Sequence, residues 1–391
     1  MNKTKFVSEE TYTAPVYLDN AATTPVDPRV AALVLRLMVE DYGNAGSRTH
    51  AYGADALAEV TRARTRLATS LGSTPDEVIF TSGATEADNI ALLGLAAEGE
   101  SSGRRHIIST AIEHKAVLEP LEHLRSRGFE VTLIAPDRAG YVDPEALLDA
   151  VRPDTLLISI MHGNNETGAL QPIGQIAAGL AEDGPYLHVD AAQTFGRETP
   201  ALLDRRIDLI SVSGHKIFGP KGVGALVARR RNGRRVPLSP LMFGGGQERG
   251  LRPGTLPTPL IAGLGLAAEL GEREREARRS LCEAIRREAL TALAPLAPVV
   301  HADPKRGVLA NILSLSIPGI DSEAVMVAAK DLVAISNGSA CTSAHYTPSH
   351  VLVAMGLDRD TTDGTVRFSW SHLTPAIPWA ALVERLDDLR L

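Results

Sequence analysis

The sequence has 391 residues, which suits about two domains, and 44% of them are apolar, so a large buried core is expected. The formal net charge is −7 at pH 7. This charge and the lack of a basic stripe argue against direct nucleic-acid binding, and the arginines between positions 229 and 235 are expected to lie on a solvated loop. No apolar run reaches the ~20 residues of a membrane span, so no membrane association is expected.

Two cysteines occur, Cys282 and Cys341, which excludes a disulfide scaffold and favours a reducing cytoplasm. Residues 1–14 are polar, lack the apolar segment of a secretory signal and predict a loose N-terminal tail. Residues 15–262 are expected to form a large α/β domain, whose first residues can pack on the second domain. Residues 263–391 predict that second domain, a smaller α+β unit that carries the loop with Cys341.

Short β-branched runs alternate with helical patterns from about residue 78 onward. Strands are predicted at residues 78–80, 106–109, 129–134, 155–161, 186–189 and 207–212, with helices over 84–97, around 118–124 and after Asp143. This βαβα order predicts a mostly parallel sheet covered by helices on both faces. Further on, the sequence predicts a charged helix over 272–290, strands at 311–317 and 366–369, and a helix over 323–332.

The segment Thr81–Glu86 follows a predicted strand and opens a predicted helix. Unpaired backbone N–H groups at a helix start attract an anion, and the hydroxyl groups of this segment add donors, so a phosphate site is expected. A simple capped helix is the alternative interpretation, because Ser82 or Thr85 can cap the helix without any ligand.

Two charged residues follow later strands. Asp190 ends a predicted strand, where ligands bind in open α/β sheets, and its carboxylate could pair with a protonated pyridine nitrogen. Lys216 follows another buried strand, and a lysine with a lowered pKa can form a Schiff base. A helix-capping role for Asp190 and a surface position for Lys216 are the alternatives. The order of phosphate cup, Asp and Lys matches the fold type I arrangement of pyridoxal-phosphate (PLP) enzymes.

The chain resembles the NifS/IscS-like cysteine desulfurases of the class-V aminotransferase group, from Tyr17 to about Leu373. The resemblance lies in seven segments: Tyr17–Pro25, Phe80–Asn89, Glu113–Val117, Met161–Gly168, Ser213–Gly224, Gly244–Thr255 and Ser339–Ser343. It implies the PLP-dependent transferase fold of type I, with pyridoxal 5'-phosphate bound by the large domain and no metal.

The same resemblance implies the cofactor-binding residues. Asp190 would face the pyridine nitrogen, Lys216 would hold the cofactor, and His114 would stack over its ring. Thr255 would reach the phosphate of a neighbouring subunit, which requires a homodimer. The remaining assignments are phosphate binding by Ala84, Thr85, Ser213, Gly214 and His215, and hydrogen bonding to the ring by Asn165 and Gln193.

Cys341 lies between small residues in the segment Asn337–Ala344, which indicates a loop. A thiol in a loop can reach a substrate and then deliver its sulfur as a persulfide, and the motif resembles the subgroup of desulfurases with a long active loop. A lone surface cysteine is the alternative interpretation. Cys282, on the charged helix, is expected to serve in packing or to lie at the surface.

Arg367 alternates with Val366 and Phe368 in a predicted strand, and Arg binds carboxylates through two parallel hydrogen bonds. The resemblance makes it the residue that holds the substrate carboxylate, with help from Asn165, whereas a structural ion pair is the alternative. His114 would act as an acid–base group on the substrate, although a lone histidine is more often a core residue.

The expected function is conversion of L-cysteine to L-alanine with formation of a Cys341 persulfide, which passes to a sulfur-acceptor protein. The acceptor could serve iron–sulfur cluster assembly, tRNA thiolation or DNA phosphorothioation. General family members often carry a longer C-terminal tail that an iron–sulfur scaffold uses, and the end at Leu391 makes a dedicated system an alternative to that partner. Selenocysteine lyase, another class-V aminotransferase and a non-catalytic scaffold are the competing functions.

Overall fold

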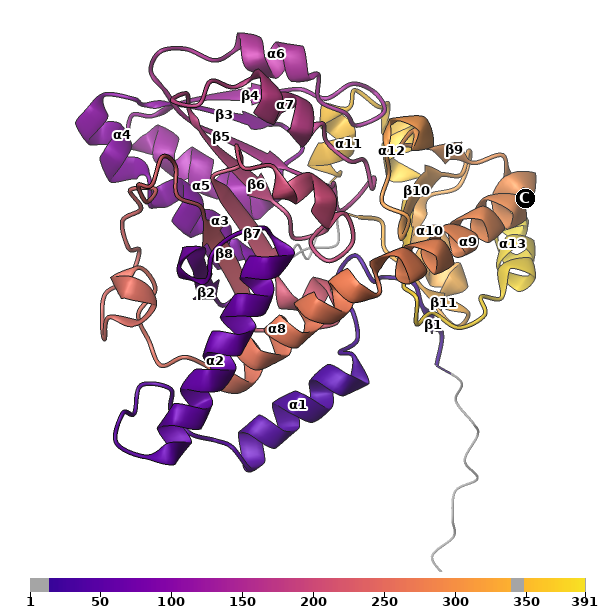
Figure 1. Cartoon of the computed structure of the whole chain (residues 1–391). Helices are drawn as coiled ribbons and strands as arrows, with labels where there is room; N and C mark the ends of the chain where they lie inside the picture. Colours follow the sequence, from indigo (N-terminus) through magenta and orange to yellow (C-terminus); the bar gives the residue numbers. More distant parts are fainter. Residues whose placement is uncertain (1–13, 339–347, 391) are drawn as a thin grey trace, which may run out of the picture.

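A large sheet of seven strands, in the order β2-β8-β7-β6-β5-β3-β4, occupies the centre of the computed structural model, which describes residues 14–338 and 348–390 (Figure 1). The strands are β2 (Val78–Thr81), β3 (His106–Thr110), β4 (Glu130–Ile134), β5 (Thr155–Met161), β6 (Tyr186–Asp190), β7 (Leu209–Ser213) and β8 (Gly224–Ala228). β8 pairs antiparallel with β2 and β7, while the other neighbours pair parallel. The predicted mostly parallel α/β fold is confirmed.

β8 was not predicted because no helix separates it from β7. It returns directly beside β7 as an antiparallel strand, so the βαβα pattern does not locate it. The predicted helix over 84–97 is interrupted at Gly94, whose carbonyl accepts a hydrogen bond from the Ser239 N–H at 2.8 Å. It therefore forms two helices, α3 (Ala84–Leu93) and α4 (Ala96–Ser102).

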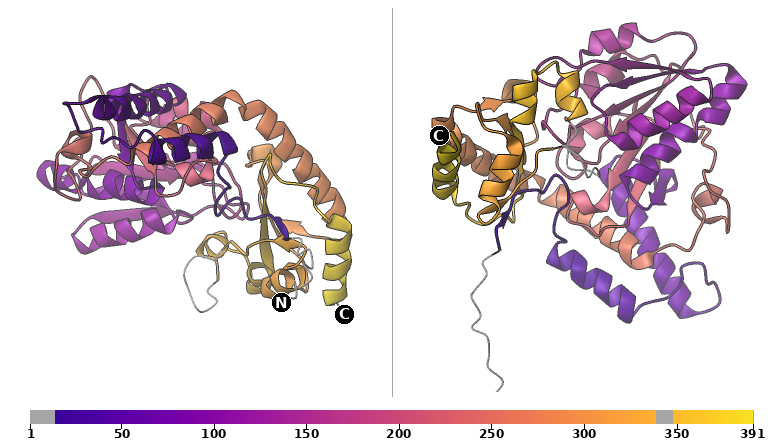
Figure 2. Two further views of the ribbon diagram at one scale, coloured as in Figure 1. Left: turned by 90° about the horizontal axis from the view of Figure 1, so that it is seen from below. Right: turned by 180° about the vertical axis from the view of Figure 1, so that it is seen from behind.

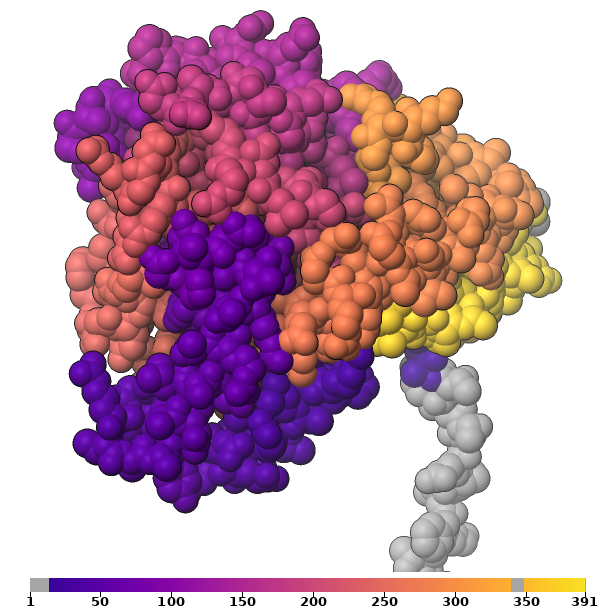
Figure 3. Space-filling view, in the orientation of Figure 1, coloured from indigo at the N-terminus to yellow at the C-terminus, as the bar shows by residue number. Residues whose placement is uncertain are grey.

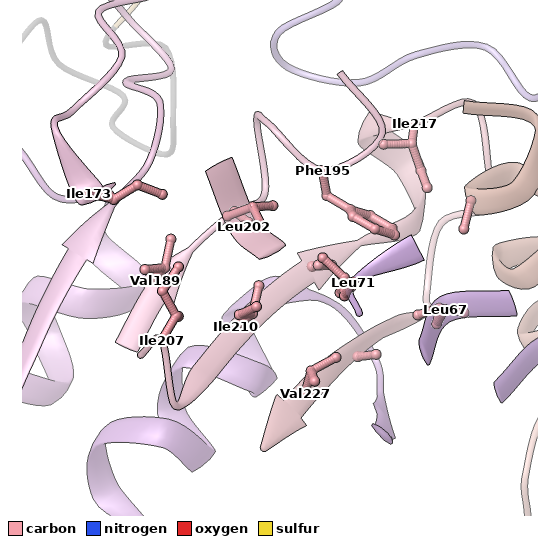
Figure 4. Packing of buried hydrophobic residues seen from close by; sticks show 14 of the residues in the cluster. Leu67, Leu71, Ile173, Val189, Phe195, Leu202, Ile207, Ile210, Ile217 and Val227 are labelled. Carbon is pink, nitrogen blue, oxygen red and sulfur yellow. The ribbon is translucent and has the colours of Figure 1, made fainter. Parts of the chain in front are cut away.

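Helices cover both faces of the large sheet (Figures 1 and 2). The remaining helices of this part are α1 (Pro28–Val39), α2 (Ala51–Ser70), α5 (Lys115–Ser126), α6 (Pro144–Asp149) and α7 (Ile173–Gly179). Successive strand residues point to opposite faces, so Ile210 packs in the cluster with Leu67 of α2, whereas Leu209 packs in the cluster with Leu121 of α5. Figure 4 shows part of the first cluster, with Ile210 close to Val189 and Ile207.

α8 (Thr258–Arg273) packs on α1 and α2 and leads directly into α9 (Arg275–Leu293). In the space-filling view, a band of orange atoms leads from the indigo part of the molecule to the remaining orange and yellow part (Figure 3). The helix predicted over 272–290 is thus the second of two, which meet at Glu274. The predicted domain boundary near residue 262 falls inside α8.

A small antiparallel sheet, β12-β10-β9, lies beyond α9. Its elements are β9 (Val299–Val300), β10 (Ile312–Ser316) and β12 (Thr365–Ser369), with α10 (Ser322–Ala329), α11 (His350–Ala354), α12 (Arg359–Asp363) and α13 (Trp379–Asp387) around it. The N-terminal strand β1 (Val16–Tyr17) pairs with β11 (Val333–Ala334), and Leu18 is buried in the same cluster as Phe368. The first described residues therefore pack with this second part of the chain.

Two single-residue expectations have clear outcomes. Cys282 is 7% exposed and packs in the core of the second part, as predicted for a packing residue. Arg229, expected on a solvated loop, is instead 1% exposed, because its guanidinium donates to the backbone carbonyls of Leu202 and Ile207. None of the helices in residues 14–338 and 348–390 has both the length and the apolar character needed to cross a bilayer.

Candidate active site

A cavity of about 640 Å³ opens where the strands β5, β6 and β7 end. We call it the strand-end cavity. It brings together ten of the residues predicted for the site: Ala84, Thr85, His114, Asn165, Asp190, Gln193, Ser213, His215, Lys216 and Arg367. Two predicted residues, Gly214 and Thr255, do not line it, and Cys341 lies outside the described residues.

One wall is the turn from β2 into α3. The first turn of α3 contains Ala84 and Thr85, whose N–H groups have no partner within the helix. The side chain of Glu86 folds back to accept from the Ser82 N–H at 2.5 Å, which fixes the turn. An ideal Cβ on Gly83 would meet no atom within 4 Å, so the space beside the turn is open. The geometry suits an anion.

The opposite side of this anion site is the turn after β7. Ser213 ends β7, and the His215 carbonyl accepts from the Thr24 N–H at 3.0 Å. Burial and the neighbouring Lys216 lower the pKa of His215 to about 4, so its ring is neutral and interacts with the Thr23 hydroxyl at 3.1 Å. The Gly214 N–H donates to Val223, so its predicted phosphate contact stays a prediction.

Asp190 forms the floor of the cavity at the end of β6. It accepts from the Ala192 N–H at 2.8 Å and is 7% exposed. Burial, together with the nearby carboxyl group of Asp88, raises the pKa of Asp190 to about 6. A positively charged group above it would reverse this shift, because the opposite charge favours the ionised carboxylate.

Asp88 also lines the cavity, and it was not predicted from the sequence. Its carboxylate is 1% exposed, and neither oxygen forms a hydrogen bond with the described residues. Burial raises the pKa of Asp88 to about 7. The ring of His188 lies 3.5 Å from it, and burial lowers the pKa of His188 to about 4, so this ring is neutral. Its two ring nitrogens lie within 2.9 Å of the hydroxyls of Ser159 and Ser211. A polar layer therefore lies beneath Asp190.

Lys216 projects into the cavity from the turn after β7, and its ammonium group donates to the carbonyl of Ala21. Gln193 donates to the same carbonyl at 2.9 Å, while its own side-chain oxygen is buried and has no partner among the described residues. The N-terminal segment thus holds both side chains at the cavity, and the Gln193 oxygen remains available to a ligand donor.

His114 is the N-cap of α5, and its Nδ1 accepts from the Ala116 N–H at 3.1 Å. The ring is exposed to the cavity, so its other nitrogen can face a ligand. The preceding residue, Glu113, is fully buried and accepts from the Thr110 hydroxyl at 2.6 Å and from the Met161 N–H at 2.9 Å. This carboxylate ties the start of α5 to the ends of β3 and β5.

Arg367 enters the cavity from β12 of the small sheet. One nitrogen pairs with Asp19 at 2.6 Å and another donates to the Asn165 carbonyl at 2.8 Å, while its Nε has no partner among the described residues. The structural ion pair, which was the alternative interpretation of Arg367, is therefore present. A substrate carboxylate that binds Arg367 bidentately would replace Asp19 as its partner.

Thr255 is exposed on a loop at the outer side of the anion site. Glu248 anchors this loop, because it accepts from the Phe80 N–H at 2.9 Å and pairs with Arg64 at 2.5 Å. Arg252, near Thr255, pairs with Glu86 of the anion turn at 2.9 Å. Glu248 was not predicted from the sequence, because its role depends on contacts with residues far away in the chain.

These groups fit pyridoxal 5'-phosphate. The cofactor has an anionic phosphate, a basic ring nitrogen and an aldehyde, and the cavity offers a helix start with hydroxyl groups, a buried carboxylate and a lysine. The buried, unpartnered oxygen of Gln193 provides a further acceptor. No group of His, Cys, Asp or Glu suited to a metal ion occurs among the described residues.

Comparisons with known proteins agree with this geometry. The family described as "Aminotransferase class-V" matches residues 16–376. The human protein "Cysteine desulfurase" is 44% identical over 362 residues, which cover 92% of this chain and 78% of the human protein. The crystal structure of DndA from Streptomyces lividans has 53% identity and a TM-score of 0.80, and the match covers 90% of this chain and 98% of DndA. A structure of SspA in complex with cysteine has 36% identity and a TM-score of 0.78, with coverage of 92% and 100%.

The chain therefore belongs to the aminotransferase class-V family. Within this family it groups with the cysteine desulfurases, which are enzymes that depend on pyridoxal 5'-phosphate.

Glu113 allows a test of the buried carboxylates. Burial raises the pKa of Glu113 from 4.5 to about 8, so the folded protein binds a proton that the unfolded chain releases. The free energy of unfolding of the cofactor-free protein should fall as the pH rises from about 5 to 8, and Glu113→Gln should remove this contribution, up to ~1.4 kcal/mol per pH unit. Denaturant unfolding at a series of pH values measures the difference.

Glu119→Gln is the matched control, because Glu119 is exposed on α5, the helix that Glu113 precedes, and should leave the pH dependence unchanged. Parallel curves for wild type and Glu113→Gln would show that Glu113 is ionised in the folded protein throughout this range.

Proposed function

We propose that this chain takes sulfur from L-cysteine, with Lys216 holding the cofactor and Cys341 receiving the sulfur as a persulfide. The observation that carries the proposal is the convergence of Lys216, Asp190 and Arg367 on one cavity. Bound there, pyridoxal 5'-phosphate supplies an electrophilic carbon for the substrate amine and a sink for electrons. The anion turn of Ala84 and Thr85 would hold its phosphate, and Asp190 its ring nitrogen.

The chain's own residues then position cysteine and move its protons. Arg367 would bind the substrate carboxylate in place of Asp19, because a guanidinium pairs with a carboxylate in two parallel hydrogen bonds. Lys216, once released by the substrate amine, would accept the proton from the substrate Cα. His114, exposed to the same cavity, would exchange protons with the substrate thiol and Cα.

Sulfur transfer is assigned to the thiolate of Cys341. It would form an S–S bond with the substrate sulfur while the substrate C–S bond breaks, and the electron pair of that bond would remain on the carbon. Protonation of this carbon gives alanine, and the persulfide passes to an acceptor thiol by thiol–disulfide-type exchange. Thiolates, not thiols, carry out both displacements.

The described residues on either side of Cys341 support this assignment. Gly338, three positions before Cys341, lines the strand-end cavity beside Arg367. At the other end, the Ser349 hydroxyl donates to Glu166 at 2.5 Å and His350 contacts the carbonyl of Glu113 at 2.9 Å.

A homodimer belongs to the same proposal. Thr255 is exposed and does not line the cavity of its own chain, as expected for a residue that completes the site of a second subunit. Exposed apolar side chains gather on α1, α2 and the turn between them: Leu35, Met38, Val39, Tyr42, Tyr52 and Leu57. A patch of this kind is typical of a protein interface.

The acceptor of the sulfur could serve iron–sulfur cluster assembly, tRNA thiolation or DNA phosphorothioation. The identity to DndA, 53%, exceeds the 44% to the human desulfurase, so we favour an acceptor of the DndA system. A reducing cytoplasm remains the proposed compartment. A comparison of turnover with cysteine and with selenocysteine separates this function from that of a selenocysteine lyase.

Replacement of the proposed cofactor lysine should abolish covalent attachment. Lys216→Ala should lose the absorbance band of lysine-bound cofactor, and borohydride reduction should leave no cofactor on any peptide. Lys221→Ala is the matched control, because Lys221 lines the same cavity and should keep the band. Cofactor attached to Lys221 in the Lys216 variant would overturn the assignment.

Replacement of the proposed nucleophile should separate sulfur transfer from cofactor binding. Cys341→Ala should release no sulfide from cysteine in the presence of a thiol reductant, yet keep the cofactor absorbance of the wild type. Cys282→Ala, at the buried cysteine of α9, should retain turnover. Undiminished sulfide release by Cys341→Ala would remove Cys341 from the reaction.

A further inference from the structure

A second cavity lies outside the strand-end cavity, at the junction that α9 forms with the large sheet. It has a volume of about 40 Å³. Its walls come from the turn after β6 that contains Arg197, the residues Ile217 and Phe218, the side of α9, and the segments around Asn311 and Trp370. We call it the Arg197 cavity. It joins elements that precede and follow α8, the helix that connects the two parts of the chain (Figure 2).

Arg197 differs from the other arginines of this cavity, because it has no carboxylate partner among the described residues. Arg278 pairs with Glu274 at 2.8 Å, Arg279 pairs with Glu283 at 2.9 Å, and Arg275 pairs with Glu272. The hydrogen bond of Arg197 goes to the Gln193 carbonyl at 3.3 Å.

Arg197 lines the cavity, and its guanidinium carbon lies 5.9 Å from the centroid of the Phe218 ring. Its Nε and Nη2 form no hydrogen bond with the described residues. Burial lowers the pKa of Arg197 to about 10, which still leaves the guanidinium charged at neutral pH. A partly buried cation with an open edge is stabilised by an anion.

The rest of the wall is mostly apolar. Phe218 is 5% exposed, His372 contacts its ring edge to face at 4.6 Å, and Ile217 and Trp370 complete the surface. Burial lowers the pKa of His372 to about 4, so this ring is neutral. Glu198 also lines the cavity, but Arg279 lies 3.3 Å from it and offsets its charge.

This chemistry selects a small carboxylate. A single guanidinium edge matches the two oxygens of a carboxylate, and apolar neighbours suit a hydrogen or methyl group behind it. One water requires roughly 10–15 Å³ of such space, so the cavity holds about three or four non-hydrogen atoms. Phosphate and sulfate carry charge on every side, but Arg197 is the one arginine of this cavity that has no carboxylate partner among the described residues.

We propose that the Arg197 cavity binds a small monocarboxylate of the size of formate or acetate, with Arg197 as its ion-pair partner. The bound anion lies against Ile217 and Phe218, which directly follow Lys216, and against Asn311 and Trp370 of the second part. It therefore links the turn that carries the cofactor lysine to the part of the chain that carries Arg367.

The test uses the purified, cofactor-loaded enzyme and titrates sodium formate and sodium acetate against sodium chloride at equal ionic strength. The chain has two tryptophans, so Trp379→Phe leaves Trp370 as the one reporter of the cavity. Formate and acetate should change Trp370 emission and raise the melting temperature in a saturable manner, whereas chloride and the longer hexanoate should not. A response that does not saturate, or that chloride reproduces, overturns the proposal.

Two variants change opposite walls of the cavity, one at Arg197 and one at Ala310. Arg197→Lys keeps the charge but removes the two-pronged edge, and should weaken carboxylate binding about tenfold or more. Ala310→Val fills the cavity from the second part of the chain and should abolish binding while Arg197 is intact. Arg359→Lys is the control, since that side chain is 86% exposed. Wild-type affinity in both cavity variants overturns the proposal, and the wild-type titration decides it if either variant fails to fold.

Discussion

The common direction of β2, β6 and β7 is the constraint on which the whole site depends. β6 and β7 pair parallel, and β8 lies antiparallel between β2 and β7, so all three strands end at one edge of the large sheet. Asp190 ends β6, the anion turn of Ala84 follows β2, and Lys216 follows β7. A reversed strand would move its charged residue to the far edge, at a distance no side chain spans.

Burial of charge then adjusts each group that the strands bring together. Burial raises the pKa of both Asp88 and Asp190, and the nearby carboxyl group of Asp88 adds to the shift of Asp190. A positively charged ring nitrogen above Asp190 would restore its ionised form. Arg367 shows the converse arrangement. It already pairs with Asp19, so a substrate carboxylate bound there would exchange one anion for another and keep the buried guanidinium paired. The site is therefore arranged to receive charged ligands.

The sequence predicted the parts of the site that depend on local order in the chain. The turn at Ala84, the strand end at Asp190 and the lysine at 216 each follow a recognisable strand, and all three meet in one cavity. It did not predict Asp88, which lies in the middle of a helix and gains its position only when α3 packs on β6. Nor did it predict Glu248, whose partners Arg64 and Phe80 lie far away in the chain. A one-dimensional pattern carries no signal for contacts of this kind.

The central claim is that one cavity brings a cofactor lysine and a nucleophilic cysteine to the same amino acid. The most direct measurement is peptide mass spectrometry of the enzyme after brief incubation with L-cysteine and without reductant. The peptide that contains Cys341 should gain the mass of one sulfur atom, and the gain should disappear in Lys216→Ala. A Cys341 peptide of unchanged mass, while alanine accumulates, would contradict the account.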